Sequence, residues 1–160
     1  SIKSGATEFV KTSRFMQERV VKNTTELPAR YLIPVSAAAL YTPLLDRQAI
    51  PYVTLSAAED VSVERFKLLR VEKETDPIYS RYAGRQIAES LGTSVVRLEA
   101  GALAVPVGGP LGFRAALILE PALLYGLYQY PAFRDTIKDG EEIPVYRQGT
   151  LREGVTKGTR

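Results

Sequence analysis

Apolar residues recur along the chain with two different periods, and these periods predict a mixture of helices and strands. Over residues 7–22, Phe9, Met16 and Val20 recur at helical spacing with Ser13 between them. This spacing places the three apolar side chains on one side of a helix. We therefore expect an amphipathic helix near the N-terminus.

The next segments predict short strands around a broken helix. Residues 29–36 have the composition of a short strand with a proline near its end, and residues 50–55 have the composition of a second strand. Between them, residues 36–48 are helix-forming, but Thr42 and Pro43 have the pattern of a new helix start. We expect one short helix followed directly by a second.

The middle of the chain predicts an extended arm and then a long helix. Residues 61–72 alternate apolar and polar positions and indicate a strand or β-arm. Residues 76–92 have Asp76 as N-cap, Pro77 in the first helical position and Gly92 at the end. A stripe at steps of four residues supports this helix: Tyr79, Ala83, Ile87 and Leu91.

The last third of the chain predicts further strands and an apolar helix. We expect one or two strands within 93–107, a central strand over 112–120 that is apolar at nearly every position, and a helix over 121–130 opened by Pro121. A short helix over 131–140 and a last strand over 141–147 follow.

These elements lack the regular strand–helix repeat of a doubly wound sheet. The predicted fold class is therefore α+β, with a mixed or mainly antiparallel sheet, three to four helices and extended basic termini. We expect a single domain over residues 1–146, which includes the N-terminal helix, and a basic mobile tail over 147–160.

The composition excludes several kinds of chemistry. The chain has no cysteine and no histidine, so thiol nucleophiles, imidazole bases and most transition-metal sites are excluded. The adjacent carboxylates Glu59–Asp60 and Glu141–Glu142 fit a solvated surface, and no calcium-loop spacing occurs. We expect no catalytic residue, no metal and no cofactor, and the sequence favours a protein that is not an enzyme.

The glycines of 108–112 raise the question of a phosphate-binding loop. Such a loop opens a helix, and in the P-loop the last glycine is followed by Lys and Ser or Thr. Here the glycines precede a predicted strand and Arg114, so we interpret them as a turn between two strands.

Positive charge gathers at the two ends of the chain. The formal net charge is +3, and the basic residues at both ends enclose a mildly acidic middle. This distribution fits an acidic partner, nucleic acid or a neighbouring subunit. The residues predicted to contact nucleic acid or another acidic partner are Lys67, Arg70, Arg81, Arg85, Arg152, Lys157 and Arg160.

The predicted helix 121–130 has no polar side. A helix that is apolar all round packs in a core or against a partner, and contact between subunits is as well supported here as a core position. The predicted oligomer interface consists of Leu124, Tyr125, Leu127, Tyr128, Tyr130 and Phe133.

Two stretches carry a resemblance to a known family. Residues 112–145, with a core strand and a helix opened by proline, resemble the axial-domain unit of phage major capsid proteins of the HK97 type. The helix of residues 79–92 after an extended arm resembles the long spine helix of those proteins. The chain is short for that family, and the segment between the two helices is brief. The resemblance implies a capsid-like subunit in a virion.

The favoured hypothesis is a non-enzymatic structural subunit that self-assembles into a homo-oligomer or shell. The alternatives are a basic nucleic-acid-binding domain and a small-ligand domain or enzyme without His or Cys chemistry. The longest nearly apolar span, residues 115–130, is interrupted by Glu120 and Pro121, so we expect no membrane insertion.

Overall fold

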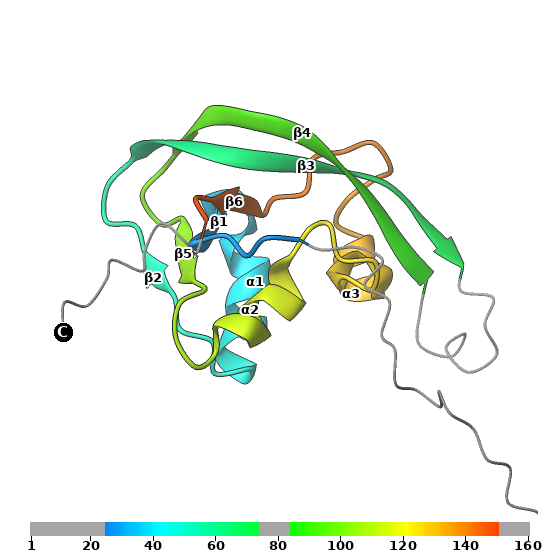
Figure 1. Cartoon of the computed structure of the whole chain (residues 1–160), viewed down its shortest axis with the longest axis horizontal. Helices are drawn as coiled ribbons and strands as arrows, with labels where there is room; N and C mark the ends of the chain where they lie inside the picture. The colour runs from blue at the N-terminus through cyan, green and yellow to red at the C-terminus, as the bar shows by residue number, and fades with distance from the viewer. Residues whose placement is uncertain (1–24, 74–83, 151–160) are drawn as a thin grey trace, which may run out of the picture.

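A six-stranded antiparallel sheet with helices on one face forms the body of the molecule (Figure 1). The computed structural model describes residues 25–73 and 84–150. The strand order is β2-β5-β1-β6-β3-β4, which confirms the α+β prediction. The elements are β1 Arg30–Ile33, α1 Val35–Arg47, β2 Val53–Thr54, β3 Glu59–Lys73, β4 Gly84–Leu98, β5 Leu103–Pro106, α2 Gly112–Leu119, the 3₁₀ helix η1 Leu127–Gln129, α3 Pro131–Arg134 and β6 Tyr146–Gln148.

Strand β1 lies in the middle of the sheet and organises both of its faces. It pairs with β5 on one side and with β6 on the other. Because successive side chains of a strand point to opposite faces, Tyr31 and Ile33 pack in the main core and Leu32 packs in a smaller cluster on the other face. The predicted strand is confirmed, and it ends before Pro34.

The main core lies between the sheet and α1, α2 and α3 (Figure 1). Helix α1 contributes Ala37, Tyr41 and Leu45, which are buried at steps of four residues. This helix is continuous through Pro43, so the predicted break at Thr42 is wrong. The buried stripe holds both halves against the sheet, and the hydroxyl of Thr42 donates to the carbonyl oxygen of Ala38 instead of capping a new helix.

The longest feature is the hairpin of β3 and β4, which arches over the helices (Figure 1). The predicted extended segment 61–72 is confirmed as β3. Its first half buries Val61 and Val63, and its second half buries Phe66 and Leu68 against the main core. Bulges occur between Arg65 and Phe66 and between Leu68 and Arg70, where the register shifts.

The helix predicted over 76–92 is wrong in its described part, because residues 84–92 belong to strand β4. Pairing with the fifteen-residue β3 outweighs the local helix signals. Gly92, expected as a helix terminator, has φ of +78° and lies at the bulge opposite Arg65. The predicted N-cap Asp76 and the first half of that helix lie outside the described residues.

The strand predicted over 112–120 is also wrong, because this segment forms helix α2. Gly112, Ala115, Ala116 and Leu119 are buried at helical spacing. Gly112 is required there, because a Cβ would lie 1.5 Å from the carbonyl oxygen of Val107. The glycines of 108–112 do form a turn, but it joins strand β5 to a helix rather than to a strand.

The predicted apolar helix 121–130 does not exist. Residues 121–126 form successive turns and lead into η1, followed by α3, which is shorter than the predicted helix 131–140. Only Val53 and Thr54 of the strand predicted over 50–55 pair. The last strand, predicted over 141–147, is shorter and begins later, at Tyr146, and it ends at Gln148. The helix predicted over 7–22 lies outside the described residues, and so do residues 151–160 of the predicted tail.

Candidate functional site

The predicted interface residues divide between the surface and the core. Leu124, Tyr125 and Tyr130 are exposed. Tyr128 and Phe133 are buried, where each stacks edge-on to a neighbouring ring and the hydroxyl of Tyr128 shares a hydrogen bond with that of Tyr41. Leu127 packs partly buried against the same core. The side chains of Tyr128 and Phe133 therefore stabilise this chain and are not available to a partner.

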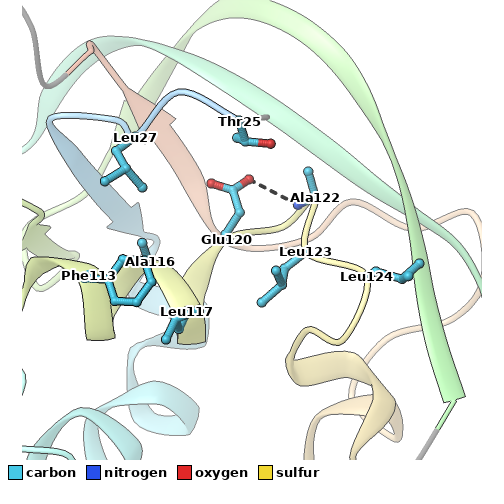
Figure 2. Close-up of a pocket in the computed structure, with 9 residues that line it drawn as sticks. All are labelled: Thr25, Leu27, Phe113, Ala116, Leu117, Glu120, Ala122, Leu123 and Leu124. Atoms are coloured by element: carbon cyan, nitrogen blue, oxygen red, sulfur yellow. Dashed lines mark hydrogen bonds between the residues drawn. The ribbon is translucent and has the colours of Figure 1, made fainter. Parts of the chain in front are cut away.

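An apolar groove lies between α2 and the turn that follows it (Figure 2). Its volume is about 310 Å³. Figure 2 shows Phe113 and Leu117 on one side of the groove and Leu123 and Leu124 on the other. The complete lining is Thr25, Leu27, Phe113, Ala116, Leu117, Glu120, Ala122, Leu123 and Leu124.

Helix α2 exposes apolar side chains at the groove because its small residues face the sheet. Ala115 and Ala116 are buried against the core together with Leu119. Phe113 and Leu117, four residues apart, then fall together on the outer side of the helix, where both are exposed. The spacing of this pair in the sequence fits one side of a helix. Because the segment was predicted to be a strand, the pair was not recognised as an exposed helix surface.

Glu120 is buried beside the groove, and its carboxylate is fully engaged. The hydroxyl of Tyr31 donates to it at 2.8 Å, and the amide of Ala122 donates at 3.2 Å. The Arg147 guanidinium lies 3.4 Å away. Burial, and then the neighbouring carboxylate, raise the pKa of Tyr31 well above its usual value. Glu120 therefore holds β1, β6 and α2 together.

A second buried polar side chain, the amide of Gln86, fixes the far wall of the groove. Gln86 of β4 donates from its side chain to the carbonyl oxygen of Pro121 at 2.7 Å and accepts from the amide of Tyr128 at 3.0 Å. The backbone amide of Gln86 donates to the carbonyl oxygen of Leu124. The turn of residues 121–128 is thereby attached to the hairpin.

The cations predicted to contact nucleic acid are paired wherever the structure describes them. Lys67 pairs with Glu89 at 2.7 Å, and Arg70 and Arg85 both pair with Glu72. The hairpin therefore presents alternating charges rather than a basic stripe. The other four predicted residues, Arg81, Arg152, Lys157 and Arg160, lie outside the described residues.

The described residues hold no other assembly of reactive groups. In residues 25–73 and 84–150, no three Asp or Glu side chains gather where they could hold a metal ion. A polar depression of about 470 Å³ lies beside Arg147, whose guanidinium donates to Glu64 at 2.9 Å. No helix within these ranges has the length and apolar character needed to cross a membrane.

Comparison with protein-family models, with curated proteins and with solved structures gave no match. The resemblance to HK97-type capsid proteins rested on a strand predicted over 112–120 and a helix predicted over 79–92. Residues 112–119 form a helix, and residues 84–92 belong to a strand. The resemblance therefore adds no support to a functional argument, and that argument depends on the groove.

Proposed function

We propose that this protein is a non-enzymatic structural subunit that self-assembles through the apolar surface of α2 and the turn after it. The observation that carries this proposal is a concentration of exposed large apolar side chains between residues 113 and 130. The exposed fractions are 67% for Phe113, 51% for Leu117, 40% for Leu124, 49% for Tyr125 and 48% for Tyr130.

Exposed apolar surface of this kind is typical of interaction sites. Soluble monomers rarely expose contiguous apolar patches larger than roughly a few hundred Å². Interface cores are enriched in aromatic side chains. Phe113, Leu117 and Leu124 also line a concave groove, which offers a shape that a partner side chain can fill. A self-assembling subunit uses this surface without any reactive group.

Among the described residues, Glu120 is the only titratable side chain that lines the groove, and its contacts favour binding over catalysis. A general acid or base has to reach a substrate atom with a hydrogen bond. Glu120 instead accepts from Tyr31 and Ala122 within the chain. Its oxygens therefore have a structural role.

The test is the mass of the full-length chain in solution, measured by light scattering after size exclusion. We expect the native chain to have a mass that is a multiple of 17.6 kDa. The double variant Phe113→Gln and Leu117→Gln removes two exposed side chains from the groove and should reduce that mass to 17.6 kDa. Because both side chains are exposed, the circular dichroism spectrum should not change.

Val53→Gln is the matched control, since Val53 is exposed on β2 and does not line the groove. This variant should assemble as the native chain does. A native chain that remains monomeric at high concentration would overturn the proposal. An assembly that survives the double variant would show that copies meet through another surface.

A further inference from the structure

The groove lies where the first 24 residues join the described chain. Thr25 and Leu27 line the groove (Figure 2). The residues immediately after them are fixed, because Pro28 is fully buried and the amide of Ala29 donates to the carbonyl oxygen of Gln148 at 3.0 Å. The Arg147 guanidinium also donates to the carbonyl oxygen of Glu26. Residues 1–24 therefore start from a fixed point at the groove.

The sequence of this segment has the features of a groove-binding helix. Its apolar stripe runs from Phe9 through Met16 to Val20, a span of twelve residues or about 16 Å of helix. An amphipathic helix bound in an apolar groove uses residues at such spacing as anchors. The position of the segment beside the groove and its apolar stripe therefore point to the same occupant.

We propose that the groove of one copy binds residues 7–22 of a second copy. This inference rests on the proposed function, because it names the segment through which copies assemble. Only Asn23 and Thr24 separate Lys22 from Thr25. The segment is therefore joined to the chain close to the groove. Only binding to the groove of a neighbouring copy links copies to one another, as the proposed function requires.

The contact is heterologous, since one surface of each copy meets a different surface of the next. It can therefore be tested by complementation between two full-length variants. The segment variant Phe9→Gln and Met16→Gln keeps its groove, and the groove variant Phe113→Gln and Leu117→Gln keeps its segment. The control Lys11→Gln and Glu18→Gln changes the opposite side of the predicted helix and leaves the net charge unchanged.

We expect each of the two variants to be a monomer of 17.6 kDa when alone. An equal mixture should form a pair with twice that mass, containing one chain of each kind by native mass spectrometry. The control variant should assemble as the native chain does.

Three results would overturn the inference. If the segment variant assembles as the native chain does, the groove has another occupant, while the proposed function remains. If both variants are monomers and stay so when mixed, the segment acts on its own groove. If the native chain is itself a monomer, the proposed function fails, and this inference fails with it.

Discussion

Gln86 joins the hairpin to the turn after α2 through both ends of its side-chain amide. It is one of two buried polar or charged side chains among the described residues, the other being Glu120. Its amide satisfies the carbonyl oxygen of Pro121 and the amide of Tyr128, which would otherwise be buried without a partner. Gly126 lies against this amide, since a Cβ there would be 2.6 Å from the Gln86 side-chain oxygen.

Gly126→Ala should therefore destabilise the protein. The φ of Gly126 is −77°, so alanine meets no backbone strain there and the effect comes from the contact with Gln86. We expect a loss of about 1–3 kcal/mol in the free energy of unfolding, measured by urea denaturation. Gly108→Ala, where a Cβ meets nothing within 4 Å, should change this free energy by less than about 0.5 kcal/mol.

The double variant Gln86→Ala and Gly126→Ala separates this clash from other causes. Because the shorter side chain removes the atoms that the new Cβ would meet, the double variant should lose less stability than the sum of the single losses. Additive losses would show that Gly126 is required for a different reason.

At the scale of elements, strand pairing and burial determined the secondary structure of two segments whose local sequence signals favoured a different structure. In the sequence, Gly92 has the position of a helix terminator. In the structure it pairs with Arg65 of β3 at a bulge of the hairpin. Ala115, Ala116 and Leu119 are buried at the spacing of a helix. The further apolar residues Phe113 and Leu117 made nearly the whole segment apolar, which is typical of a central strand. The order of apolar and polar residues within a segment does not show which strand or core the segment packs against.

The candidate site was predictable only in part, for the same reason. The sequence identified the region around Leu124, Tyr125 and Tyr130, because large apolar side chains gather there. It did not separate them from Tyr128 and Phe133, which pack with Tyr41 from a distant helix. The other wall of the groove, Phe113 and Leu117, needed the correct helix. By contrast, β3 was predictable because its alternation matches its burial. Strand β1 was predictable because its apolar residues are buried on both faces of the sheet.

Helix α1 provides a test of how much stability its proline costs. Pro43 is exposed and lies inside the helix, where it lacks the amide hydrogen that would bond to the preceding turn. Pro43→Ala restores this bond and should raise the free energy of unfolding by about 1–2 kcal/mol, after the offset from a freer unfolded chain.

Urea denaturation measures the free energy of unfolding of this variant and of a matched control. Pro34→Ala changes a proline that precedes the helix, where no helical hydrogen bond is missing. This variant should show no gain in stability. A gain of equal size at both positions would mean that the helix interior is not the cause.

For the whole molecule, buried phenols determine how stability responds to alkaline pH. Burial raises the pKa of Tyr128 to about 12, and burial likewise raises the pKa of Tyr31 and Tyr41 well above 10.0. A raised pKa in the folded state means that stability is complete below the unfolded pKa and is lost as the pH rises above it.

We therefore expect the free energy of unfolding to fall above about pH 10, by up to about 1.4 kcal/mol per pH unit for each buried tyrosine. Denaturant titrations between pH 8 and pH 11.5 measure this loss (roughly the range in which an ordinary phenol titrates). Tyr128→Phe removes one of these groups and should make the loss shallower. Equal slopes for the native chain and the variant would contradict the expectation.

The position of β1 also has a consequence for the order in which the chain folds. The hairpin of β3 and β4 joins segments that are close in sequence, so it can form early. Strand β1, in contrast, has β5 and β6 as neighbours, and β6 ends at Gln148. During synthesis from the N-terminus, the central strand therefore waits for nearly the last described residues to leave the ribosome. Until then, Glu120, which lines the groove, lacks the neighbouring guanidinium of Arg147.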